Sequence, residues 1–205
     1  MIKEKFGDRL DGWIQTAFPF LFRRPLNPNL LTVTGTLVSL LAATAFACGW
    51  VVAGGIGILA GGFFDLVDGV VARHNGTATR FGAFLDSTLD RLVDMALLVG
   101  IAVHFAENGR PGAVLLAGSA LVATVLVSYS KACAERYVSE LRVGVLERGE
   151  RTGILAAGAI LGLLVPALWV VAIGSTITVV QRFERAHREM TQIDAEERAG
   201  LKEPA

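Results

Sequence analysis

The sequence is poor in the residues that stabilise small secreted or metal-bound soluble domains. Cysteine occurs only as Cys48 and Cys133, both within apolar segments, so neither an internal disulfide nor a cysteine-ligated metal site is expected. The three histidines, His74, His104 and His187, are scattered and set no metal-ligand spacing. Net charge is also absent, because 19 basic residues balance 19 acidic ones, and this balance gives no reason to expect a nucleic-acid partner.

Apolar residues dominate the chain instead. They make up 53% of the 205 residues, and the mean hydropathy of +0.53 indicates a polytopic membrane protein embedded in a lipid bilayer. Runs near the ~20 residues that a bilayer requires cover 30–49, 51–73, 84–106, 112–136 and 153–185. The last run is too long for one span, and Pro166 divides it. We therefore predict an all-α fold with about six transmembrane helices.

The two ends of the chain differ from this membrane region. Residues 2–24 place apolar side chains at helical spacing with charged ones on the other side, so we expect an amphipathic interfacial helix in an N-terminal segment, 1–25. A membrane domain then covers 26–188, and 189–205 forms a polar cytoplasmic tail. Residues 45–47 resemble a signal-peptide cleavage site, but the apolar stretch there has full spanning length, so the N-terminus is expected to be retained.

The distribution of basic residues predicts the orientation in the membrane. One set of loops and termini holds Lys3, Lys5, Arg9, Arg23, Arg24, Arg73, Arg80, Arg136, Arg142, Arg148, Arg151, Arg185 and Arg188. The opposite set holds only Arg110. Because positively charged loops stay in the cytoplasm, we predict a multi-pass protein of the cell membrane with both termini and the connections near 74–81 and 136–152 on the cytoplasmic side.

Four aspartates stand close together in this apolar setting. Asp65 and Asp68 are three residues apart, and Asp86 and Asp90 are four apart, so each pair shares one face of its helix. The short connection between the two helices makes them antiparallel neighbours, which brings the four carboxylates together. Single aspartates at helix ends often extend to water, but four at this spacing favour a site for Mg²⁺ or Mn²⁺. Four carboxylates exceed the need of one ion, so two ions are predicted.

Glycine and arginine accompany the carboxylates. Gly69 and Gly82 lie beside them, where the absence of a side chain lets a ligand approach the backbone, although helix packing is an alternative reason for either glycine. Arg73, one turn beyond Gly69, is placed to bind a phosphate. Alternatively, Arg73 is a positive charge at a helix end that helps to set the orientation of the protein in the membrane.

The pattern Asp65-x2-Asp68-Gly69-x2-Ala72-Arg73-x8-Gly82-x3-Asp86-x3-Asp90 resembles, at all eight positions, the signature of the CDP-alcohol phosphotransferases. This resemblance implies transfer of a substituted phosphate from a CDP-linked donor to an alcohol, with CMP as the leaving group. It implies that Asp65, Asp68, Asp86 and Asp90 bind metal and that Asp90 also serves as the general base.

The same resemblance implies a pocket for the nucleotide and its diphosphate. The residues expected there from the signature are Asp68, Gly69, Ala72, Arg73 and Gly82. The segment from Pro28 to Thr32 is similar to the start of the family's first membrane helix, which adds Asn29 and Thr32 to this pocket. Capping of the helix is the alternative role of these two residues.

Four further basic residues are candidates for binding the acceptor. Lys131, Arg148, Arg151 and Arg182 stand in segments similar to those of the phosphatidylinositol-phosphate synthases within this family, in which the matching positions bind inositol phosphate. Ion pairing with nearby glutamates is the alternative role. The donor implied is CDP-diacylglycerol or CDP-archaeol. Cys133 and Gly149 depart from that subgroup, which has arginine and proline there, so glycerol 3-phosphate is the alternative acceptor.

Other features complete the expectations. A homodimer is implied by the family, and the glycines of the second span favour close helix approach. Asp94 follows Asp90 by four but lies outside the signature, so we expect it to form a hydrogen bond between helices. A metal-ion transporter or channel is the competing class, because buried aspartates also mark ion paths. Such a path predicts acidic groups throughout the membrane depth, whereas here they form one layer.

Overall fold

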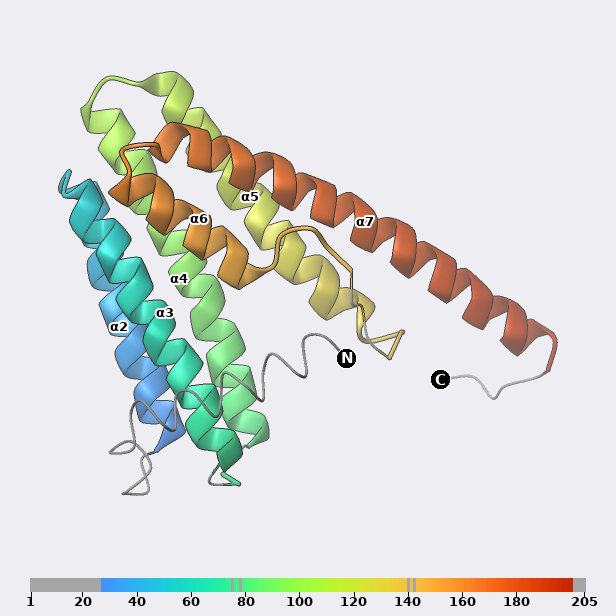
Figure 1. Cartoon of the computed structure of the whole chain (residues 1–205). Helices are drawn as coiled ribbons and strands as arrows, with labels where there is room; N and C mark the ends of the chain where they lie inside the picture. Colours follow the sequence, from blue (N-terminus) through green and yellow to red (C-terminus); the bar gives the residue numbers. More distant parts are fainter. Residues whose placement is uncertain (1–26, 75, 78, 140, 142, 201–205) are drawn as a thin grey trace.

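The computed structural model describes residues 27–200, with the exception of 75, 78, 140 and 142. The predicted amphipathic helix at 2–24 lies outside the described residues, as does the end of the predicted tail, 201–205. The described part contains six helices and no strand, which confirms the prediction of an all-α fold (Figure 1).

The helices follow one another as α2 (Pro28–Ala47), α3 (Val51–His74), α4 (Arg80–Glu107), α5 (Pro111–Ala134), α6 (Arg148–Ile160) and α7 (Leu164–Arg198). Four of them, α2, α3, α5 and α7, are long and apolar enough to cross a membrane, as a multi-pass membrane protein requires. α4 has the length but also carries charged residues, and α6 has only 13 residues, fewer than the ~20 of a full span. The predicted number of about six spans therefore stays a prediction.

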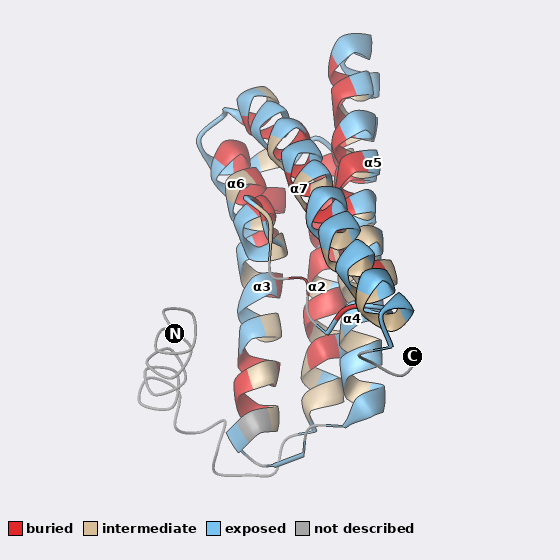
Figure 2. Ribbon diagram, turned by 90° about the vertical axis from the view of Figure 1, so that its right-hand side faces the viewer, coloured by how far each residue is buried: buried red, intermediate tan, exposed pale blue. Residues whose placement is uncertain are grey.

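The last apolar run is divided, but ahead of the residue that we expected to divide it. α6 ends at Ile160, Gly162 has a φ of +72°, and α7 starts at Leu164, so Pro166 lies in the first turn of α7. Proline is tolerated there because its missing N–H is not needed within the helix. α7 then continues past 188, so the predicted tail begins as part of this helix. Its final turns are mainly exposed (Figure 2).

Close packing of α2, α3 and α4 places the site. α2 packs against both α3 and α4, α5 packs against α4 and α7, and α6 contacts α3 and α7 (Figure 1). The core includes the buried residues Phe46, Leu97 and Leu168. A Cβ atom on Gly57 of α3 would lie only 2.6 Å from Cβ of Ala42 on α2. Glycine thus lets the two backbones approach closely enough for polar side chains on α2 to reach α3.

The connection between α5 and α6 is held by α7. Thr178 is fully buried, and its Oγ1 accepts hydrogen bonds from the N–H groups of Val145 (3.2 Å) and Leu146 (3.1 Å). Arg182 donates from Nε to the carbonyl oxygen of Val143 at 3.0 Å. These bonds fix the segment that leads into the first turn of α6, where two of the predicted acceptor arginines lie.

Candidate active site

Three of the predicted metal ligands lie together on α3 and α4. Ligand oxygens of Asp65, Asp68 and Asp86 are all within 4.8 Å of one another. Oδ1 of Asp86 is buried and accepts no hydrogen bond from any described residue. Carboxylates this close repel each other unless a cation lies among them. An all-oxygen ligand set on two rigid helices, with an oxygen left unsatisfied, fits a divalent cation.

Thr32 belongs to this cluster, which its spacing in the sequence did not reveal. Its hydroxyl lies 2.5 Å from Oδ2 of Asp68 and 3.1 Å from the carbonyl oxygen of Pro28. A hydroxyl has one proton to donate, and a hydrogen bond to a carboxylate is stronger than one to a neutral carbonyl. Thr32 therefore orients Asp68 from the start of α2, in addition to the predicted place of Thr32 in the nucleotide pocket.

Asp90 lies one turn further along α4 and has a different partner. Its Oδ1 is 2.9 Å from Nη1 of Arg148. The same nitrogen donates to Oδ2 of Asp65 at 2.8 Å. Arg148 thus links α6 to both α3 and α4. The expectation that Asp90 also binds metal and acts as a general base stays a prediction.

A cavity of about 200 Å³ opens beside the carboxylates, and we call it the α2–α4 cavity. It is lined by Pro28, Asn29, Thr32, Asp68, Gly69, Ala72, Thr77, Thr79, Gly82, Ala83 and Asp86. It brings together every residue predicted to contact the nucleotide and diphosphate except Arg73, whose side chain lies outside the described part. Thr77 and Thr79 were not predicted, because they stand in the connection between α3 and α4 at unspecified positions of the signature.

The N-terminal caps of α2 and α4 fix the positions of residues that line this cavity. The N-cap of α2 is Asn27, whose side chain accepts the N–H of Asn29 at 3.0 Å, so Asn29 itself is not the cap. Thr79 caps α4 by accepting the N–H of Gly82 at 2.9 Å. A Cβ on Gly82 would lie 3.0 Å from Oδ1 of Asn29 and 3.1 Å from Oγ1 of Thr79. Glycine at this position therefore keeps the cavity open.

A second cavity, of about 270 Å³, contains the cations, and we call it the basic cavity. It is lined by Ser87, Asp90, Arg91, Asp94, Val127, Ser128, Lys131, Glu147, Arg148, Arg151 and Arg182. The four predicted acceptor residues, which come from α5, α6 and α7, all line it. Asp86 lines the α2–α4 cavity and Asp90 the basic cavity. Because residues four apart on a helix are neighbours, the two cavities adjoin along α4.

The four cations are held to different degrees. Lys131 has a half-exposed side chain, and its Nζ is 3.7 Å from Oε1 of Glu135. Arg151 is buried, with Nη2 3.1 Å from Oδ2 of Asp94. Arg182 is also buried and donates to two main-chain carbonyl groups, one on α5 and one in the connection before α6. Lys131 is thus accessible from the cavity, whereas Arg151 and Arg182 are built into its wall.

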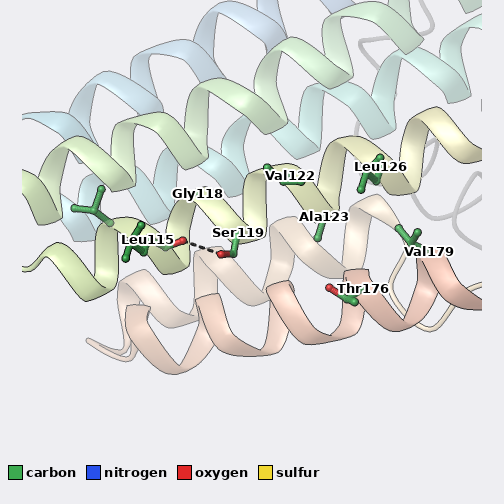
Figure 3. Close-up of a pocket in the computed structure, with 9 residues that line it drawn as sticks. Leu115, Gly118, Ser119, Val122, Ala123, Leu126, Thr176 and Val179 are labelled. Carbon is green, nitrogen blue, oxygen red and sulfur yellow. Dashed lines mark hydrogen bonds between the residues drawn. The ribbon is translucent and has the colours of Figure 1, made fainter.

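A larger hollow, of about 660 Å³, lies between α5 and α7 (Figure 3). It is lined by Val114, Leu115, Gly118, Ser119, Val122, Ala123, Leu126, Thr176 and Val179. Its hydroxyls bond within their own helices, Ser119 to the carbonyl oxygen of Leu115 at 2.9 Å and Thr176 to that of Ala172 at 2.8 Å. This apolar surface suits hydrocarbon and contains none of the predicted site residues.

Comparison with known proteins relates this arrangement to characterised enzymes. A family model described as CDP-alcohol phosphatidyltransferase matches residues 26–181. The phosphatidylinositol phosphate synthase of Streptomyces avermitilis is 41% identical over 192 residues, which cover 86% of this chain and 78% of that protein. The archaetidylinositol phosphate synthase of Pyrococcus horikoshii is 37% identical over 166 residues, which cover 80% of this chain and 86% of that protein.

Solved structures of a related protein have the same fold. The phosphatidylinositol phosphate synthase of Mycobacterium tuberculosis with CDP-DAG bound superposes with a TM-score of 0.73 at 30% identity, over 89% of this chain and 94% of that one. Its complex with manganese and citrate gives a TM-score of 0.74 at 35% identity, over 82% of this chain and 86% of that one.

Proposed function

Because this chain belongs to the CDP-alcohol phosphatidyltransferase family, we propose that it transfers a phosphatidyl or archaetidyl group from a CDP-linked lipid to inositol phosphate and releases CMP. It is a divalent-metal-dependent enzyme of phospholipid biosynthesis. The names of the curated relatives, synthases of phosphatidylinositol phosphate and archaetidylinositol phosphate, support inositol phosphate as the acceptor.

One observation carries the proposal: a carboxylate cluster lies where two cavities of different character adjoin. The α2–α4 cavity is small and is lined by glycine, hydroxyl and amide groups, as a nucleotide diphosphate requires. The basic cavity offers lysine and arginine, as a phosphorylated acceptor requires. Asp86 and Asp90 lie one on each side of the junction. A donor phosphorus and an acceptor hydroxyl can therefore meet beside α4.

The reaction follows from this arrangement. The acceptor hydroxyl oxygen attacks the phosphorus that carries the lipid, a new P–O bond forms, and the P–O bond to CMP breaks. We assign Asp90 the role of taking the hydroxyl proton, because it lines the basic cavity and stands one turn from the metal-binding carboxylates. The two cavities hold the reactants in the orientation that the displacement needs.

The metal requirement fits the same residues. Asp65, Asp68 and Asp86 would hold a divalent ion, and Asp90 would complete the set for a second one. When bound, these ions neutralise charge on the diphosphate and on the leaving CMP. We propose Mg²⁺ as the usual ion with Mn²⁺ as a substitute, since both accept carboxylate oxygens. The manganese complex of the related synthase supports this metal class.

The donor lipid, the sidedness and the assembly are part of the same proposal. CDP-diacylglycerol is the donor that the related complex with CDP-DAG supports, and CDP-archaeol is the ether-lipid equivalent. The site faces the cytoplasm of the cell membrane, because the basic residues cluster at its end of the helices. We also propose a homodimer. Glycerol 3-phosphate is the competing acceptor, because the basic cavity recognises phosphate before it distinguishes the alcohol.

A CMP-release assay tests the proposal. Purified protein is given CDP-diacylglycerol and Mg²⁺ with inositol phosphate, glycerol 3-phosphate or free inositol. We expect CMP release with inositol phosphate, and a loss of about 100-fold or more for Asp90→Asn, the range that a general base contributes. Thr34→Val is the control, because Thr34 is partly exposed on α2 and its hydroxyl bonds within that helix. Turnover with glycerol 3-phosphate alone would refute the acceptor, and a fully active Asp90→Asn would refute the mechanism.

A further inference from the structure

Asp94 is a buried carboxylate outside the signature that contacts both arginines of the first turn of α6. It is 7% exposed and lies on α4, one turn beyond Asp90. Its Oδ2 accepts a hydrogen bond from Nη2 of Arg151 at 3.1 Å. Its Oδ1 lies 3.6 Å from Nε of Arg148. One carboxylate thus reaches two cations, because residues three apart share a face of α6.

The pair with Arg151 is fixed from both sides. Arg151 is 3% exposed, and its Nη1 donates to the carbonyl oxygen of Leu146 at 3.2 Å. Among the described residues, Asp94 is the acidic group in ion-pair contact with it. A buried guanidinium that loses its carboxylate is left uncompensated in a medium that cannot solvate it. The charge of Asp94 therefore determines where Arg151, and with it the start of α6, lies against α4.

The orientation of the Arg148 guanidinium depends on the same carboxylate. Its Nη1 contacts Asp65 and Asp90, while its buried Nε lies 3.6 Å from Oδ1 of Asp94 and makes no hydrogen bond with any described residue. Attraction between the Asp94 carboxylate and Nε opposes rotation of the guanidinium about its contacts at Nη1. Since Arg148 lines the basic cavity, the orientation of its guanidinium determines how it can bind a phosphate there.

We propose that Asp94 is a positioning residue for acceptor binding, which holds Arg151 and Arg148 so that the cations of the basic cavity are set before the acceptor arrives. The inference rests on the proposed function of that cavity. Asp94 does not line the α2–α4 cavity, and both arginines that it contacts line the basic cavity, so its effect should fall mainly on the acceptor. Groups that orient the side chains around a bound metal ion typically contribute about 10- to 100-fold to its affinity, and we expect an effect of this order for side chains around a bound phosphate.

The kinetic test compares Asp94→Asn with the wild type. We expect the KM for inositol phosphate to rise roughly tenfold or more, with the KM for CDP-diacylglycerol within about twofold. Asp94→Glu should recover part of the loss, because it restores the charge. Glu189→Gln is the matched control, since Glu189 also pairs with an arginine, Arg185 at 2.5 Å, but on the exposed part of α7. Equal changes in both KM values, or an unchanged KM for inositol phosphate, would overturn the inference.

A second measurement does not depend on turnover and guards against a misfolded variant. Phenylglyoxal modifies accessible guanidinium groups, and mass spectrometry assigns each modified arginine. Arg151, with a side chain 4% exposed, should be protected in the wild type and in Glu189→Gln but labelled in folded Asp94→Asn protein. Protection that persists in this variant would overturn the positioning role. If the wild type releases no CMP with inositol phosphate while Arg151 labelling changes as expected, the proposed acceptor is wrong and the positioning of Arg151 stands.

Discussion

Replacement of Thr32 by valine tests how the metal-binding carboxylates are held. The two side chains have nearly the same shape, so Thr32→Val removes little besides the hydroxyl. That hydroxyl lies 2.5 Å from Oδ2 of Asp68, in a site where both residues are at least nine-tenths buried. The change retains the three carboxylates, whose ligand oxygens lie within 4.8 Å of one another, but removes the donor that orients Asp68. The expected effect is weaker metal binding in a protein that still folds.

The magnitude follows from the bond that is lost. Loss of a group that orients a metal ligand typically costs about 10- to 100-fold in metal affinity. The metal concentration for half-maximal CMP release should therefore rise by roughly 10- to 100-fold. Direct titration with Mn²⁺, followed by electron paramagnetic resonance, should show the same shift without turnover. Thr32→Ser, which retains the hydroxyl, should recover most of the affinity.

The control lies one turn along the same helix. Thr36 is also buried, and its hydroxyl donates to the carbonyl oxygen of Thr32 at 2.9 Å, within α2. Thr36→Val makes the same chemical change without touching a carboxylate, so its metal midpoint should remain within about twofold of the wild type. If Thr32→Val and Thr36→Val need the same metal concentration for half-maximal CMP release, Thr32 does not support the metal site.

Two further substitutions probe the α2–α4 cavity and the connection before α6. In Gly82→Ala the added Cβ would lie 3.0 Å from Oδ1 of Asn29. Overpacking that costs about 1 kcal/mol or more should raise the KM for CDP-diacylglycerol about fivefold. Gly62→Ala is the control and should leave this KM unchanged, because there is open space around its Cβ. In Thr178→Val two N–H groups of the connection before α6 lose their acceptor. Each buried unsatisfied group costs about 1–3 kcal/mol, so the thermal unfolding temperature, followed by tryptophan fluorescence, should fall by several degrees. Thr176→Val, whose hydroxyl bonds within α7, should stay near the wild type, and equal stabilities of these two variants would count against a structural role of Thr178.

The sequence by itself determined the helical membrane character and most of the candidate site. Helices are the structure that an apolar chain adopts in lipid, because every backbone N–H and C=O group must be bonded within the segment. The fixed rise and period of a helix place Asp65 and Asp68 on one face, and the short connection to the next helix predicted that Asp86 lies beside them, as it does. The resemblance to the family added Asn29, Thr32, Gly69, Ala72 and Gly82, which line the α2–α4 cavity. It also added Arg73, whose side chain lies outside the described part.

Only the tertiary structure decided which charged groups pair across the fold. Lys131, Arg148 and Arg182 lie on three different helices, and helical periodicity says nothing about how separate helices approach one another. The same reason hid the contact between Thr32 and Asp68, which are 36 residues apart. Asp94 was expected to bond between helices, but its partners on α6 depend on how the connection is held by α7. Local spacing therefore predicted the carboxylate cluster, and packing between helices determined the surroundings of each carboxylate.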